Sequence, residues 1–224
     1  FSQQGQDWGF PPANMEAFQG AGYDLFIKEV QKNCCFGSAV RIDHVMRFFR
    51  LFCIPEGHSA AEGAYLKQPF EDLLRIVCLE SLRNEVLIVG EDLGTVPEYV
   101  RDRLEAMDIL SYKLLYFERD DEQGFILPQD YPELALVTIT THDLPTLAGF
   151  WIHKDIKVRQ ESGMFENHEA AVKATREREA DKQRLLSLLD ELGLLPEHSD
   201  RDARAYPEVT GELHHAVVSF LSRT

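Results

Sequence analysis

Four short runs of apolar and β-branched residues recur along the first two thirds of the chain. They span Ala39–Ile42, Val86–Val89, Ser111–Phe117 and Leu134–Thr140. Each run is apolar throughout instead of alternating with polar residues, which is typical of a parallel strand covered on both faces. We therefore predict four buried strands.

Helical patterns lie between most of these runs. Met15–Lys32 and Phe70–Leu82 place apolar residues at helical spacing. A further helix is predicted to open at Thr95, which can cap the first free amides, with Glu98 completing a capping box. Alternation of strands and helices predicts an α/β fold with a parallel sheet.

The spacing of the predicted strands suggests a particular α/β architecture. Successive strands begin 47, 25 and 23 residues apart. A (β/α)₈ TIM barrel uses about 31 residues per strand–helix unit, so the spacing fits such a barrel with an enlarged first loop. Four strands are too few to close a barrel, and we therefore predict a partial one.

The character of the chain changes beyond about residue 160. Asn167–Leu192 is predicted to be one long charged helix that Gly193 ends, with Arg176–Glu179 on a solvated face, and Pro207–Leu221 a last helix. We therefore expect two parts: residues 1–160, the partial barrel, and residues 161–224, a helical segment.

Composition excludes several classes of partner. The 224 residues are 44% hydrophobic, which is enough for a core, and carry a net charge of −15. A surface this acidic repels nucleic acids and anionic membranes, and no run approaches the roughly 20 apolar residues of a membrane span. The chain starts at Phe1 rather than Met, so we expect a piece of a longer protein, and its cysteine pattern favours a cytoplasmic one.

The metal-binding residue types show no metal pattern. The four cysteines match no zinc motif, and the eight histidines are scattered. Buried, reduced thiols are the simplest interpretation of the cysteines. We expect neither a metal nor an organic cofactor.

Acidic residues follow three of the predicted strands. Asp43 comes directly after the first strand, Glu91 follows the second, and Asp143 follows the fourth. In a parallel barrel all three would meet at the carboxyl end of the strands, where active sites form. Converging carboxylates suit glycosidic bond chemistry. An acid at a strand end is also a common helix cap or loop hydrogen-bonding group, and this alternative stays open.

Four motifs in order resemble the bacterial 4-α-glucanotransferases, also called amylomaltases or disproportionating enzymes, of glycoside hydrolase family 77. They are Gly5–Pro12 (GQDWGFPP), Arg41–Met46 (RIDHVM), Gly90–Pro97 (GEDLGTVP) and Thr141–Thr146 (THDLPT). The resemblance implies that the four strands are about the fourth to seventh of a TIM barrel. The helices near the C-terminus would then lie between the seventh and eighth strands.

The resemblance also implies a role for each site residue. Asp43 matches the nucleophile, Glu91 the general acid/base and Asp143 the transition-state stabiliser. Five further residues match groups that bind or orient the substrate, with Arg41 beside the nucleophile: Arg41, His142, Trp8, Gln6 and His44.

The implied activity is transfer of α-1,4-glucan segments between maltooligosaccharides or starch-derived glucans by a retaining double displacement. A glucan hydrolase with the same acids, or a non-catalytic glucan-binding piece, are the alternatives. An open parallel sheet exposes strand edges, so self-association through those edges is also expected.

Two residues near the motifs have plainer interpretations. We expect Asp92 to be a hydrogen-bonding partner for the loop after Glu91. Trp151 is expected in the core or at its rim rather than as a sugar platform.

Overall fold

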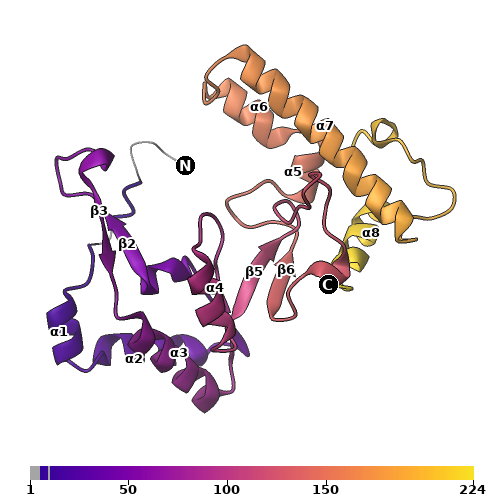
Figure 1. Ribbon diagram of the computed structural model, residues 1–224. Helices are drawn as coiled ribbons and strands as arrows, with labels where there is room; N and C mark the ends of the chain where they lie inside the picture. Colours follow the sequence, from indigo (N-terminus) through magenta and orange to yellow (C-terminus); the bar gives the residue numbers. More distant parts are fainter. Residues whose placement is uncertain (1–5, 10) are drawn as a thin grey trace. The chain divides into compact units, whose positions relative to one another are not determined.

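The computed structural model describes residues 6–9 and 11–224 (Figure 1). Gly5 and Phe10 of the first motif lie outside the described residues. The chain forms two compact units, residues 1–112 and 113–224. Together they contain helices and a parallel sheet, so the predicted α/β class is confirmed.

The first unit contains most of the parallel sheet. Its helices and strands are α1 (Met15–Gly20), α2 (Asp24–Cys34), β1 (Ala39–Ile42), β2 (Arg50–Cys53), β3 (Ala64–Lys67), α3 (Phe70–Asn84), β4 (Leu87–Gly90), α4 (Glu98–Glu105) and the start of β5 (Leu110–Leu114), with 3₁₀ turns at Val45–Phe48 and Ala60–Glu62. β4 pairs in parallel with β1 on one side and with β5 on the other. The carboxyl ends of these strands therefore lie next to one another.

The core of the first unit lies between this sheet and its helices. α2 packs on α3, and α3 packs on β4. Fully buried side chains include Leu74, Val77 and Val100. Burying a residue of this size contributes about 1.5–3 kcal/mol. The apolar faces of these helices thus fix the sheet that positions the first two acids.

The predicted helix over residues 15–32 is interrupted. α1 ends at Gly20, and Gly22 and Tyr23 both adopt a left-handed backbone with φ near +60° before α2 begins. The Tyr23 hydroxyl donates to Asp72 at 2.6 Å, which ties the break to α3. The prediction of one continuous helix was therefore wrong.

The predicted capping box at Thr95 is also wrong. α4 starts at Glu98 with Pro97 at the N-cap position, and no side-chain hydrogen bond caps it. The N–H of Val96 instead donates to the carbonyl of Gly94 at 3.0 Å, which turns the chain before the helix.

Two short antiparallel strands, β2 and β3, form a hairpin that the sequence patterns did not indicate. Arg50 lies opposite Lys67 and Cys53 opposite Ala64. The rings of Phe52 and Tyr65 meet edge to face across the hairpin at 5.0 Å, and both side chains are exposed.

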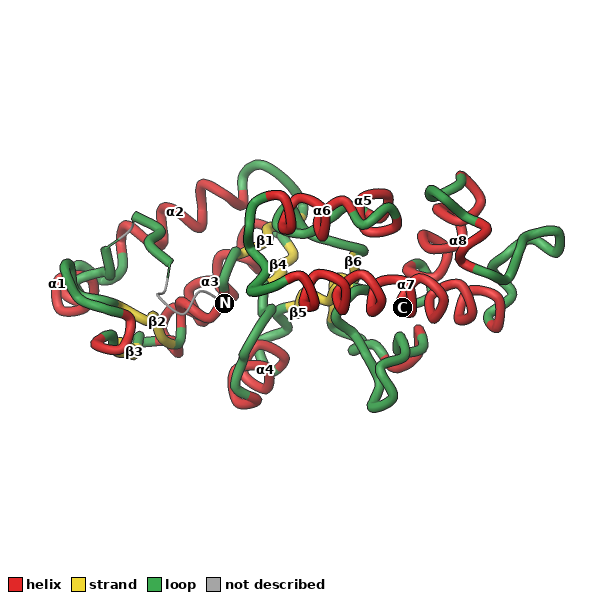
Figure 2. Tube along the Cα trace, turned by 90° about the horizontal axis from the view of Figure 1, so that it is seen from above, coloured by secondary structure: helices red, strands yellow, loops and turns green. Residues whose placement is uncertain are grey.

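The second unit is mainly helical. Its elements are the end of β5, β6 (Ala135–Thr138), α5 (Leu147–Trp151), α6 (Lys154–Glu161), α7 (His168–Glu191) and α8 (Gly211–Leu221), with 3₁₀ turns at Pro128–Asp130 and Ala203–Ala205. Figure 2 shows α7 as the long straight helix against which α5, α6 and α8 pack. Leu185, Leu189, Phe220 and Trp151 are fully buried among these helices, which confirms the expectation for Trp151.

The long helix α7 begins and ends as the sequence predicts. Asn167 caps its first turn by accepting from the N–H of Ala170 at 2.8 Å. At its end Gly193 takes φ +65°, and the N–H of Leu194 donates to Leu189 at 2.8 Å, a Schellman arrangement.

One side chain of α7 departs from the predicted solvated face. Arg178 forms two hydrogen bonds of 2.8 Å to the carboxylate of Asp155 in α6, and a third to the carbonyl of Phe150 in α5. Its guanidinium carbon lies 3.9 Å from the centre of the Phe150 ring. Arg178 therefore joins three helices, and the prediction that residues 176–179 are all solvated was wrong at this position.

Candidate active site

Asp43 and Glu91 lie next to each other at the carboxyl ends of β1 and β4. Ile42 is paired with Gly90 in the sheet, so Asp43 and Glu91 each follow a paired residue. The N–H of Glu91 donates to the carbonyl of Ile42 at 2.9 Å, and the N–H of Val45 donates back to the carbonyl of Glu91 at 3.0 Å. The ladder continues past the strands and holds both acids at one edge of the sheet.

The carboxylate of Glu91 is held by backbone amides. Its Oε2 accepts from the N–H of His44 at 2.8 Å, and its Oε1 accepts from the N–H of Leu93 at 2.7 Å. The residue is only 9% exposed. Two donors on opposite oxygens fix the plane of the carboxylate, since rotation about its last bond would break both hydrogen bonds.

Asp43 has a different environment. Its side chain is 68% exposed, and its Oδ1 lies 2.7 Å from Nη1 of Arg41. Arg41 lies over the ring of Tyr112, with its guanidinium carbon 4.8 Å from the ring centre. Asp43 is thus an accessible carboxylate beside a cation, whereas Glu91 is an enclosed one.

Three more of the predicted residues lie together around His44, which directly follows Asp43 in the chain. The ring of Trp8 meets the imidazole of His44 edge to face at 5.1 Å, and the Trp8 indole N–H donates to Gln6 at 3.3 Å. Trp8 is 55% exposed. Its open ring face is the kind of surface on which the apolar face of a sugar packs.

His44 itself has an unusual backbone. It takes φ +46° and ψ +61°, in the left-handed region that non-glycine residues adopt at some cost. In this conformation its N–H donates to Glu91. Local backbone strain of this kind is common where the surrounding structure must place a group accurately.

Asp143 and His142 belong to the second unit and lie in the loop after β6. Nε2 of His142 is 3.3 Å from Oδ2 of Asp143, and both side chains are largely exposed, at 70% and 78%. The N–H of Asp143 donates to the hydroxyl of Thr141 at 3.2 Å. The structure therefore places these two predicted residues side by side within their own unit.

Asp92 and Tyr112 carry contacts that were not anticipated. Oδ1 of Asp92 accepts from the N–H of Tyr112 at 2.9 Å, so Asp92 binds the next strand rather than its own loop. The side chain of Asp92 is almost completely buried, with Nε of Arg101 at 3.5 Å from Oδ2. The sequence showed a second acid directly after Glu91 but did not indicate which group this acid binds.

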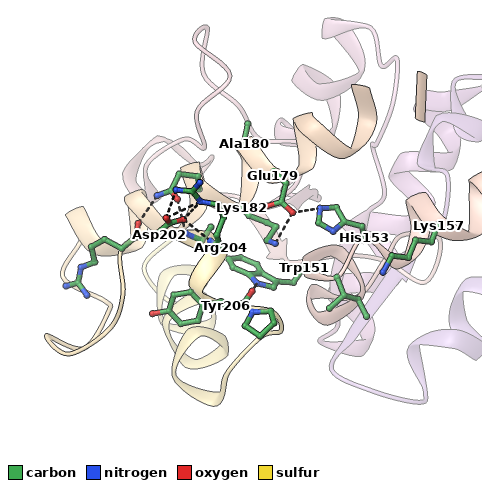
Figure 3. A pocket seen from close by; sticks show the side chains of 14 residues that line it. Trp151, His153, Lys157, Glu179, Ala180, Lys182, Asp202, Arg204 and Tyr206 are labelled. Carbon is green, nitrogen blue, oxygen red and sulfur yellow. Dashed lines mark hydrogen bonds and ion pairs between the residues drawn. The ribbon is translucent and has the colours of Figure 1, made fainter. Parts of the chain in front are cut away.

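The second unit also contains a hollow of about 1070 Å³ (Figure 3). Several of its charged side chains lie in ion pairs within the lining: Glu179 lies 3.0 Å from His153 and 3.3 Å from Lys182, and Arg204 lies 2.7 Å from Asp202. These pairs give the lining of the hollow a mixed, polar character.

The described part of the chain shows no group of three or more His, Cys, Asp or Glu side chains arranged to hold a metal ion. None of its described helices combines the length and the apolar character needed to cross a membrane.

Comparisons with known proteins agree on one family. The family model described as 4-alpha-glucanotransferase matches residues 1–224. The 4-alpha-glucanotransferase of Haemophilus influenzae is 43% identical over 199 residues, which cover 89% of this chain and 28% of that protein. The corresponding Mycobacterium tuberculosis protein is 35% identical, covering 91% and 28%.

A solved structure gives the same result. The crystal structure of amylomaltase from Corynebacterium glutamicum superposes with a TM-score of 0.87 at 30% identity, covering 97% of this chain and 31% of that one. The chain thus spans less than a third of the length of these relatives. It belongs to the 4-alpha-glucanotransferases, glycoside hydrolase family 77.

Proposed function

We propose that the protein transfers α-1,4-glucan segments between maltooligosaccharides by a retaining double displacement. The observation that carries this proposal is the pairing of an exposed carboxylate, Asp43, with an enclosed one, Glu91, at adjacent strand ends. Retaining glycosidases need two such carboxyl groups, one to attack and one to move a proton. The family of the chain supports the same reaction.

The two steps follow from the environments of these acids. An oxygen of Asp43 attacks the anomeric carbon while Glu91 gives its proton to the leaving oxygen, so that a covalent glycosyl–Asp43 ester forms. Glu91 then takes a proton from the acceptor sugar hydroxyl, which attacks the same carbon and releases Asp43. Arg41 orients Asp43 in both steps through its 2.7 Å contact.

The remaining predicted residues are proposed to bind the substrate. Asp143 and His142 would bind hydroxyls of the distorted donor sugar. Gln6 and Trp8 would cover its ring, which is consistent with the exposure of Trp8, and His44 would line an acceptor subsite. Ordinary maltooligosaccharides supply every atom of this reaction, and the scheme includes no metal or organic cofactor.

The larger architecture is also a proposal. We infer that β1, β4, β5 and β6, the four strands of the larger sheet, correspond to about the fourth to seventh strands of a TIM barrel. In this view residues 1–160 belong to the barrel, and residues 161–224 form the helical segment before its last strand. A cytoplasmic location and self-association through exposed sheet edges stay predictions.

The first test is the product pattern from maltotriose with the protein at its natural length. Transfer predicts glucose together with maltooligosaccharides longer than the substrate. Maltose and glucose alone would favour the hydrolase, and binding without turnover would favour the non-catalytic alternative.

Asp43→Asn should abolish turnover but retain binding. Asp24→Asn is its matched control, because Asp24 is a similarly exposed aspartate in an ion pair, with Lys28 at 2.6 Å.

A second test traps the intermediate. Glu91→Gln supplied with maltosyl fluoride should accumulate a maltosyl ester on Asp43, because fluoride leaves without a proton whereas the second step needs the base. Intact mass and peptide mapping would locate the adduct. An adduct on another residue would contradict the assignment of Asp43.

A further inference from the structure

Tyr112 lies level with the two acids of the first unit. Ser111 of β5 is paired with Gly90 of β4, so Tyr112 stands one residue further along β5, as Glu91 does on β4. Asp43, Glu91 and Tyr112 therefore lie level with one another on three neighbouring strands, with Asp43 and Glu91 just past the ends of β1 and β4 and Tyr112 within β5. Nothing in the motifs assigns a role to Tyr112.

The backbone of Tyr112 is anchored by a buried charge. Its N–H donates to Oδ1 of Asp92 at 2.9 Å, and the Asp92 side chain is 1% exposed. Arg101 provides the countercharge at 3.5 Å. Hydrogen bonds to ionised groups in a low-dielectric setting are stronger than neutral ones, so this contact fixes where the ring of Tyr112 leaves the sheet.

The ring of Tyr112 in turn carries the guanidinium of Arg41, whose carbon lies 4.8 Å from the ring centre. Arg41 makes one hydrogen bond to Asp43, from Nη1 at 2.7 Å. Its Nε is buried and has no hydrogen-bond partner among the described residues. Arg41 therefore does not hold Asp43 as a two-pronged fork, and the aromatic face is what restricts its plane.

We propose that Tyr112 is a positioning residue for Asp43, acting through Arg41, and that Asp92 anchors Tyr112 for this purpose. The inference rests on the proposed function, because it assumes that Asp43 is the nucleophile. Tyr112 touches neither substrate nor reacting atoms in this scheme. Its effect is to keep the cation, and with it the attacking carboxylate, in one orientation.

The proposal makes the aromatic face, rather than the hydroxyl, the important part of Tyr112. Without the ring the guanidinium can turn away, and a misplacement of about 1 Å at a reacting group costs on the order of 100-fold in rate. Loss of the ring should therefore slow the chemical step and leave substrate binding unchanged.

The test compares Tyr112→Leu with Tyr112→Phe in the protein at its natural length. We expect Tyr112→Leu to lower kcat by about 10- to 100-fold while KM stays within about twofold of the wild type. Tyr112→Phe should keep kcat within about threefold of the wild type, because the phenyl face still supports Arg41. Tyr112→Met is a second ring-free variant in case the leucine variant does not fold.

Phe165→Leu is the matched control. It removes a similar contact far along the chain, the ring that lies 4.5 Å below the guanidinium carbon of Arg159, and should leave kinetics at the wild-type level. Equal kcat values for the ring-free and phenylalanine variants, with Asp43→Asn inactive, would overturn the role of Tyr112 alone. Turnover by Asp43→Asn would overturn the proposed function first.

Discussion

The backbone N–H of His44 donates a 2.8 Å hydrogen bond to Oε2 of Glu91, across 47 residues of sequence. His44 directly follows Asp43, so this bond ties the enclosed acid to the residue beside the exposed one. The backbone of His44 is left-handed at this point, with φ +46°. Main-chain atoms therefore hold the Glu91 carboxylate next to the segment that carries Asp43.

The first prediction concerns this backbone. His44→Val should unfold at lower urea than His44→Gly, with a difference of about 1–2 kcal/mol, because a β-branched residue is strained at positive φ and glycine is not. Both variants lose the imidazole, so the comparison isolates the backbone. Equal stabilities would show that residue 44 is not left-handed in solution.

The second prediction concerns the two tryptophans. Trp151 is fully buried and donates to the carbonyl of Tyr206 at 2.8 Å, whereas Trp8 is 55% exposed. Subtracting the emission spectrum of Trp151→Phe from that of the wild type isolates the emission of Trp151, which should be blue-shifted and resistant to quenching by iodide. The same subtraction with Trp8→Phe isolates the emission of Trp8, which should be red-shifted and quenched by iodide. A quenchable Trp151 signal would contradict the packing of the second unit.

The third prediction concerns the end of α7. Gly193→Ala should destabilise the protein by about 1 kcal/mol, because its φ of +65° is costly for any residue with a Cβ, although the space beside it is open. Gly211 is the matched control: its surroundings are also open, but its φ is not positive. Gly211→Ala should raise stability by about 0.4–1 kcal/mol by restricting the unfolded chain. Thermal unfolding of the two variants should therefore shift in opposite directions.

The fourth prediction concerns pH. Burial lowers the pKa of His153, with the neighbouring cations Lys182, Arg178 and Lys157 acting in the same direction and Glu179 opposing them. The unfolded chain then binds this proton more tightly than the native one, so stability should fall as pH drops below about 6.5.

The measurement is urea unfolding between pH 7.5 and 5 for wild type and His153→Asn, an exchange that suits the left-handed backbone at this position (φ +59°). The variant should lose less stability on acidification than the wild type. His198→Asn is the control, because His198 also pairs with a glutamate, Glu212 at 3.2 Å, but is exposed. A wild-type slope in His153→Asn would contradict the prediction.

Local patterns predicted much of the fold. Each predicted strand overlaps an observed one, since buried apolar runs carry the signal themselves. The break between α1 and α2 was missed because Tyr23 adopts a φ of +60°, which a tyrosine rarely favours. The hydrogen bond that accompanies the break joins Tyr23 to Asp72, which is distant in the sequence. The hairpin of β2 and β3 was missed because its exposed aromatic pair does not alternate with polar residues.

The adjacency of Asp43 and Glu91 in the candidate site was predictable. Each follows an apolar run, and parallel strands align their ends. The contacts that hold them were not predictable, because they depend on register: the N–H of Tyr112 reaches Asp92 only when β5 pairs with β4 as it does. The burial of Arg178 likewise depends on where α5 and α6 place Phe150 and Asp155.

The main-chain cradle of Glu91 has an evolutionary consequence. Its two donors belong to residues 44 and 93, but neither donor is a side chain. Nineteen of the twenty amino acids at either position keep this backbone N–H, and only proline removes it. Homologous chains that differ at positions 44 and 93 can therefore keep both hydrogen bonds to Glu91.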